Sequence, residues 1–66
     1  MHLKTITSDE AVIVMSHDEL VFLRSAVNET LEAVPKFEFR ARTGETREQA
    51  LEIWRQLNGF FHKIEG

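Results

Sequence analysis

The sequence predicts a single small α+β domain spanning residues 1–66, and three observations support this class. Two short segments near the start alternate in polarity or are rich in β-branched residues, as strands are. Two longer stretches repeat apolar residues every three or four positions, and each follows a helix-capping motif. A chain of this length forms one domain.

An antiparallel β-hairpin is predicted from residues 2–6 and 11–15. Residues 2–6 alternate roughly, with Leu3 and Thr5 on one side and Ile6 on the other. Residues 11–15 (AVIVM) form a short, apolar and β-branched run, which favours a strand over a helix. Because a bare hairpin is marginal in water, we expect one of its faces to pack on the helices.

The long helix predicted over residues 17–34 is the best-defined element of the chain. Ser16 is a good N-cap, and Glu19 lies three residues further on, which completes a capping box. Pro35 ends the helix, because proline disfavours helical geometry in the residue before it. The apolar side chains on its main face are Leu20, Leu23, Val27, Leu31 and Val34.

The segment after Pro35 is predicted to be an extended link or a third strand over residues 37–42. Phe37 and Phe39 alternate there with charged residues, and a period of two is typical of a strand. In that geometry both phenylalanines face the core.

A second helix is predicted over residues 47–63. Thr46 and Gln49 form another capping box, and Gly44 marks a turn before it. Its apolar residues recur at three- and four-residue steps, namely Ala50, Ile53, Trp54, Leu57, Phe60, Phe61 and, at its end, Ile64.

The length and the wide apolar faces together predict a homodimer. Domains this small bury only about 60% of the surface that the unfolded chain exposes. The chain has no cysteine, which excludes disulfides and thiolate metal sites, and its three histidines lack metal-ligand spacing, so we expect no metal. Oligomerisation is the remaining source of burial. The face expected to form core or dimer contacts consists of Leu23, Val27, Leu31, Trp54, Leu57 and Phe61.

The net charge of −3 argues against nucleic acid or an anionic membrane as a partner, because both favour basic surfaces. No apolar run approaches the ~20 residues of a membrane span, and the N-terminal segment lacks the order of a signal peptide. The absence of cysteine fits a reducing compartment. We therefore expect a soluble cytoplasmic protein that self-associates. An unidentified protein is a second partner compatible with the sequence.

The titratable and nucleophilic residues form no catalytic pattern. The three serines fall in a turn, a cap and a helix, and no histidine is paired with an orienting carboxylate. The sequence therefore predicts no catalytic residue and no cofactor. The function it favours is that of a non-enzymatic interaction or regulatory protein.

A basic group near the second helix supports an alternative function. Arg40, Arg42 and Arg47 flank the start of that helix, where free backbone N–H groups favour anions. They could bind nucleic acid or an anionic ligand. The competing interpretation is that these arginines form solvated ion pairs with nearby glutamates, which is the more common arrangement.

The stretch SHDELVFLRSAVNETLEAV, followed by FEFRARTGETREQALEIWRQLN, resembles a family of small uncharacterised bacterial proteins. The matching positions are Asn28, Glu29, Phe37, Phe39, Arg42, Thr43, Gly44 and Arg47. The resemblance implies a strand pair, a helix, a link and a second helix, with no established activity, cofactor or partner. It makes Asn28, Glu29 and Arg42 the first polar positions to consider for a functional surface. Alternatively, Glu29 and Arg42 tie the link to the first helix.

Overall fold

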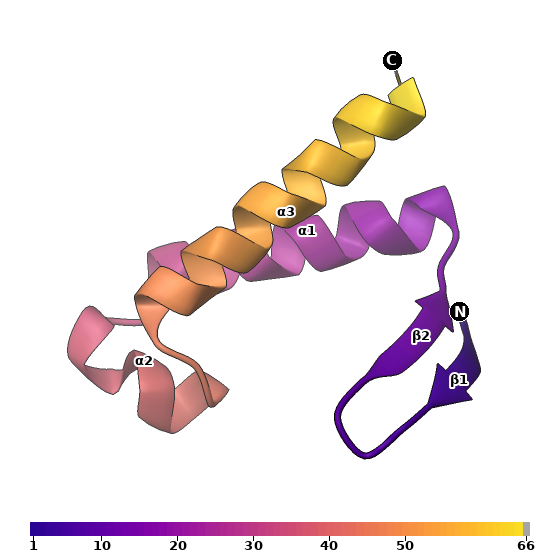
Figure 1. The fold of residues 1–66 in the computed structure, drawn as a ribbon. Coiled ribbons are helices and arrows are strands. Elements are labelled where there is room, and N and C mark those ends of the chain that lie inside the picture. Colours follow the sequence, from indigo (N-terminus) through magenta and orange to yellow (C-terminus); the bar gives the residue numbers. More distant parts are fainter. Residues whose placement is uncertain (66) are drawn as a thin grey trace.

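A two-stranded sheet followed by three helices makes up the fold. The structure is a computed structural model that describes the backbone of residues 1–65 and the side chains of residues 1–63. Its elements are β1 (His2–Ile6), β2 (Ala11–Val14), α1 (His17–Ala33), α2 (Lys36–Thr43) and α3 (Arg47–Glu65). Figure 1 shows α1 and α3 packed together, with α2 at one end of the pair and the hairpin at the other. The predicted α+β class, hairpin and two long helices are confirmed.

Capping motifs fix where both long helices begin. The Glu19 backbone N–H donates to Ser16 Oγ at 3.2 Å, and the Ser16 N–H donates to Glu19 Oε1 at 2.9 Å. At the start of α3 the Gln49 N–H donates to Thr46 Oγ1 at 3.2 Å, and the Thr46 N–H donates to Gln49 Oε1 at 3.0 Å. Both capping boxes therefore satisfy backbone donors that the helices leave free.

Residues 37–42 are helical, so the prediction of an extended link or third strand was wrong. Lys36–Thr43 form α2, which follows Pro35 at its N-cap position. Glu38 and Arg42 lie one turn apart and form an ion pair at 3.6 Å, a spacing that stabilises helices. Gly44 ends the helix with φ of 88°, a conformation that glycine adopts without steric cost.

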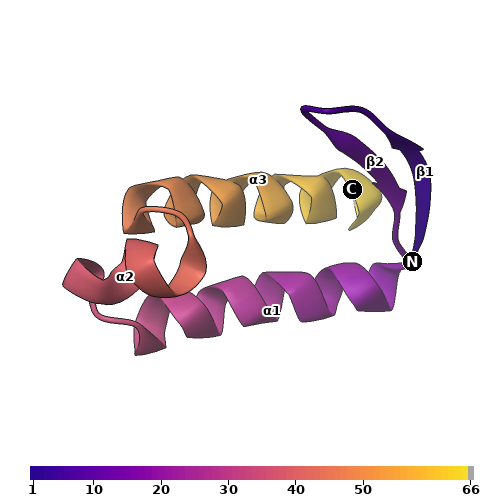
Figure 2. The same ribbon diagram turned by 90° about the horizontal axis from the view of Figure 1, so that it is seen from below.

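The helical conformation of α2 separates its two phenylalanines. Residues two apart lie about 200° around a helix, whereas they share one face of a strand. Phe39 is accordingly buried, with 1% of its surface exposed, and Phe37 is 87% exposed. A strand here would also have lacked a partner, because β1 and β2 lie at the opposite end of the helix pair (Figure 2).

The core lies between the three helices and is small. Among the described side chains only four apolar residues are buried, namely Leu31, Phe39, Leu57 and Phe61. The Arg24 guanidinium carbon lies 4.1 Å from the centre of the Phe61 ring, and the His17 ring meets the same ring edge-on at 5.4 Å. Cation–π and edge-to-face contacts therefore cover the Phe61 end of the core.

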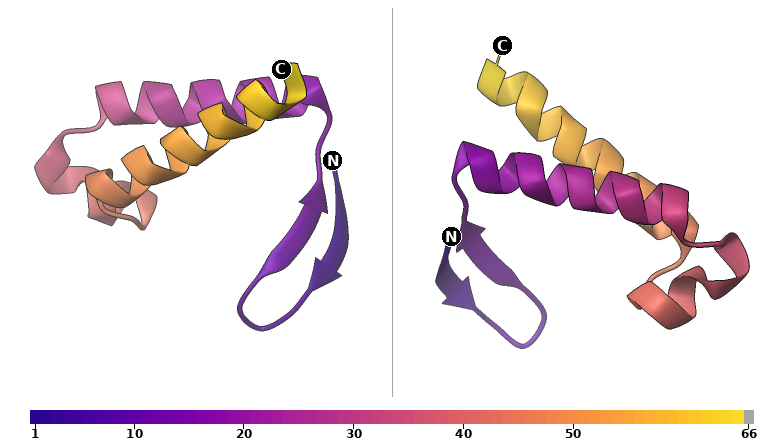
Figure 3. Two further views of the ribbon diagram at one scale, coloured as in Figure 1. Left: turned by 45° about the horizontal axis from the view of Figure 1, so that its top comes forward. Right: turned by 180° about the vertical axis from the view of Figure 1, so that it is seen from behind.

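The hairpin stands clear of the helices, contrary to the expectation that it packs on them. Within residues 1–65, no Cα of β1 or β2 lies within 8 Å of a Cα of a helix. The two views of Figure 3 show the hairpin projecting from the start of α1. The connection is only two residues long, Met15 and Ser16, which limits how far the strands can fold back over α1.

Candidate functional site

An open groove of about 260 Å³ runs between the three helices. Two of its lining residues are threonines, yet both hydroxyls are turned to the backbone. Thr30 Oγ1 donates to the Ala26 carbonyl at 2.8 Å, and Thr43 Oγ1 donates to the Phe39 carbonyl at 2.8 Å. Their methyl groups are left to add to an apolar surface. We call this the helical groove; its lining is Ala26, Val27, Thr30, Phe39, Thr43, Glu45, Ala50 and Ile53.

Exposed apolar side chains extend the helical groove towards the other end of the helix pair. Leu23 lies one turn before Ala26 and Val27 on α1 and is 36% exposed. Phe60 lies two turns after Ile53 on α3, and these two side chains are 47% and 44% exposed. Residues at these spacings share a helix face. The apolar surface therefore follows both helices towards the end that carries the hairpin.

A second exposed apolar surface lies on the hairpin. A β-bulge interrupts β1 between Leu3 and Thr5, so that Leu3 pairs with Ile13 and Ile6 pairs with Ala11. Without the extra residue, Leu3 and Ile6 would face opposite sides of the sheet, as strict alternation along a strand predicts. The bulge places both on one side, which we call the hairpin face: Leu3, Ile6, Ala11 and Ile13. Leu3, Ile6 and Ile13 are 54%, 68% and 50% exposed.

A polar cleft lies across α1 and α3 on another side, with a volume of about 320 Å³. Asn28 is offset by two residues from Ala26 and Thr30, so it faces away from the helical groove. Asn58 Nδ2 donates to the Trp54 carbonyl at 3.2 Å, which fixes one wall. The lining residues are Arg24, Ser25, Asn28, Glu29, Trp54 and Asn58.

The structure brings Asn28 and Glu29, two of the predicted site residues, into the polar cleft together. Sequence reasoning missed Arg24, Ser25 and Asn58 there. Arg24 could have been predicted from the sequence as a neighbour of Asn28, because residues four apart lie on one helix face. Arg24 is half-buried and packs on Phe61, so its position near an apolar face did not mark it as polar surface.

The three predicted arginines do not converge on this cleft. Arg40 and Arg42 are two residues apart in α2 and therefore point to different sides of that helix. Arg42 pairs with Glu38, not with Glu29, and Arg47 is half-buried in the first turn of α3. None of the three lines the polar cleft. Anion binding by this group stays a prediction that the geometry does not favour.

The predicted core or dimer face divides between the core and the surface. Leu31, Leu57 and Phe61 are buried, and Val27 and Trp54 are half-buried. Leu23 is the sixth member of the set; it is 36% exposed and lies one turn before the groove residues Ala26 and Val27 on α1. Three members of this face therefore build the core, while Val27 lines the helical groove and Trp54 lines the polar cleft.

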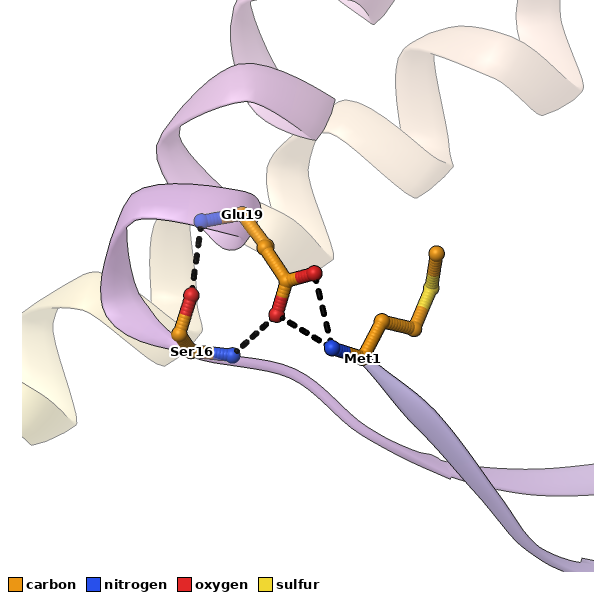
Figure 4. A network of polar contacts seen from close by, with 3 residues as sticks. All are labelled: Met1, Ser16 and Glu19. Atoms are coloured by element: carbon orange, nitrogen blue, oxygen red, sulfur yellow. Dashed lines mark hydrogen bonds and ion pairs between the residues drawn. The ribbon is translucent and has the colours of Figure 1, made fainter.

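Glu19 and the Met1 ammonium group form the shortest ion pair among the described residues, at 2.8 Å (Figure 4). Both of its carboxylate oxygens accept hydrogen bonds from the Met1 ammonium group at 2.8 Å, and Oε1 also accepts from the Ser16 N–H. The bond to the Met1 ammonium group, followed by the Ser16 backbone bond, lowers the pKa of Glu19 from 4.5 to about 2. This pair connects the start of the hairpin to α1.

We expect Glu19→Gln to flatten the acid dependence of stability. A lowered folded-state pKa gives stability that is complete above the unfolded value of 4.5 and is lost as pH falls towards about 2. Glutamine keeps the capping box but loses the charge. The thermal midpoint of the wild type should therefore fall more steeply between those two pH values than that of the variant.

The control for this titration is Asp18→Asn, which removes a neighbouring carboxylate and leaves the Met1–Glu19 pair in place. Its midpoint should follow the steeper wild-type slope. Parallel slopes for Glu19→Gln and the wild type would show that the ion pair does not form in solution.

No family model, curated protein or solved structure matches this chain. Within residues 1–65 no helix is long and apolar enough to cross a membrane. The described part of the chain also contains no group of three histidine, aspartate or glutamate side chains that could hold a metal ion. The site therefore rests on its own geometry, which is two exposed apolar surfaces and one shallow polar cleft.

Proposed function

We propose that this protein is a non-enzymatic interaction or regulatory protein that works as a homodimer in the cytoplasm. The observation that carries the proposal is the area that a single copy leaves exposed. The absence of cysteine supports a reducing compartment. The helical groove supplies the surface on which two copies would meet.

The exposed area can be compared with that expected for a folded monomer. The chain exposes 5346 Å² and has a mass of 7.7 kDa. A folded monomer of this mass is expected to expose about 4300 Å². The excess is about 1000 Å², which is close to the ~800 Å² that each partner contributes to a standard protein–protein interface.

The exposed apolar residues supply an interface of the right chemistry. Ile53 lines the helical groove, and Leu23 and Phe60 lie further along the same two helices on the matching faces. The hairpin face adds Leu3, Ile6 and Ile13 as a separate exposed surface. Exposed apolar surface on this scale is uncommon on monomers and typical of interaction sites. A second copy carries the same helical groove, so a two-fold symmetric dimer sets one groove against the other.

Sedimentation analysis over a range of micromolar concentrations tests the proposal. The wild type should sediment as a dimer. Leu23→Glu places a charge beside the groove, one turn before Ala26 and Val27, and should raise the dimer dissociation constant by at least about tenfold, because a carboxylate without a partner is costly to bury in an apolar interface. Ser25→Glu is the matched control, since Ser25 is an exposed residue of the same helix outside the groove.

A wild-type chain that stays monomeric throughout this range contradicts the proposal. A dimer that tolerates Leu23→Glu as well as Ser25→Glu contradicts the use of the helical groove. Circular dichroism of both variants distinguishes a lost interface from a lost fold.

A further inference from the structure

The two outer edges of the hairpin differ in their protection against pairing. Each strand of a two-stranded sheet has one edge bonded to its neighbour and one edge free. On β1 the free edge is interrupted by the bulge between Leu3 and Thr5, and the residue at the bulge is Lys4. Bulges and edge lysines are two devices by which proteins prevent a strand from pairing with another chain.

The free edge of β2 has neither device. Ala11–Val14 contains no charged residue, no proline and no bulged residue of its own. Across the turn the Thr7 N–H donates to the Glu10 carbonyl at 2.9 Å, so the backbone of Glu10 faces β1. Because alternate residues direct their backbone groups to opposite edges, Ala11 and Ile13 present theirs to the free edge.

We propose that β2 pairs antiparallel with β2 of a second copy, which gives a four-stranded sheet of order β1–β2–β2–β1 across the dimer. This inference rests on the homodimer proposed above and identifies β2 as the strand through which the two copies pair. The two unprotected strands lie at the centre of that sheet, and the two strands with a bulge and a lysine lie at its edges. In this arrangement the uncharged β2 strands are paired on both sides, and the outer edges belong to β1, whose bulge and Lys4 prevent further pairing.

The stability of the hairpin supports this pairing. A two-stranded hairpin needs further strands or a packed helix to be stable in water, and neither strand of this one packs closely on a described helix. Pairing at β2 doubles the number of strands and joins two hairpin faces into one apolar surface. Antiparallel pairing about a two-fold axis places β2 beside an identical β2 strand. Because β2 carries no charged residue, this pairing brings no like charges together.

A matched pair of proline variants tests which edge is used. Leu3 and Ile13 are directly opposite residues with similar exposure, and both direct their N–H groups to a free edge. Proline removes that N–H without breaking the ladder between β1 and β2. We expect Ile13→Pro to raise the dimer dissociation constant at least a hundredfold, and Leu3→Pro to change it less than tenfold.

Cysteine crosslinking gives a second measurement that does not depend on a destabilising variant. The chain has no cysteine, so a single introduced thiol reports on one site. At the centre of the four-stranded sheet, Val12→Cys or Ile13→Cys lies within disulfide range of its copy. Leu3→Cys lies three strand spacings from its copy, roughly 14 Å, which is beyond the ~7 Å limit between Cα atoms. Covalent dimer should form under mild oxidation with at least one β2 cysteine and not with Leu3→Cys.

The outcomes separate this inference from the homodimer on which it rests. A wild-type dimer that survives Ile13→Pro, with no faster crosslinking from β2 than from Leu3→Cys, overturns the pairing and leaves the homodimer standing. A monomeric wild type overturns the homodimer and, with it, the pairing of β2 with a second copy. Loss of the dimer in Ile13→Pro together with β2-specific crosslinking supports the inference.

Discussion

Phe39→Ala is expected to leave the protein largely unfolded at room temperature. Phe39 is the most completely buried large side chain among the described residues, with 1% of its surface exposed. Truncating a buried phenylalanine to alanine typically costs about 3–5 kcal/mol. A domain of this length has a total stability of about 3–10 kcal/mol, so the loss is comparable to the whole.

Phe37→Ala is the matched control, because it removes the same side chain two residues away in the same short helix. Phe37 is 87% exposed, and its truncation should change the free energy of unfolding by less than about 0.5 kcal/mol. Urea unfolding followed by circular dichroism measures both. Equal losses would mean that both phenylalanines share one buried face, which is the geometry of a strand and not of α2.

Local chemistry explains which parts of the fold could be predicted. Ser16 with Glu19, and Thr46 with Gln49, satisfy backbone donors within a few residues of the chain, so the starts of α1 and α3 follow from sequence spacing alone. Pro35 ends α1 for an equally local reason. These elements needed no knowledge of what packs against them.

The helix α2 could not be predicted because its pattern supports two structures. The alternation of Phe37 and Phe39 with charged residues fits a strand, and the four-residue step from Glu38 to Arg42 fits a helix. The choice depends on whether a partner strand is available. That is a tertiary fact, since β1 and β2 lie at the far end of the helix pair.

The candidate site was predictable only where it follows one helix. Asn28 and Glu29 are neighbours on α1, and the structure places both in the polar cleft. The hairpin face depends instead on the register between β1 and β2, because the bulge brings Leu3 and Ile6 to one side. A bulge of this kind leaves no mark in the period of the sequence.

The thermal midpoint is expected to depend on protein concentration. If folding and self-association are one reaction, a hundredfold dilution lowers the apparent free energy of unfolding of the dimer by about 2.7 kcal/mol. With an unfolding entropy of about 2.1 cal/mol/K for each residue, two chains of this length should melt on the order of 10 °C lower after that dilution. Reversible thermal unfolding followed by circular dichroism at several concentrations measures the shift.

The size of this shift follows from how little each copy buries. With only four buried apolar side chains among those described, most of the apolar area that stabilises the fold would have to come from the second copy. Leu23→Glu, if it dissociates the dimer, should therefore melt at a lower temperature that no longer responds to dilution. A wild-type midpoint that is the same at every concentration would mean that one copy folds on its own, despite about 1000 Å² of excess exposed surface.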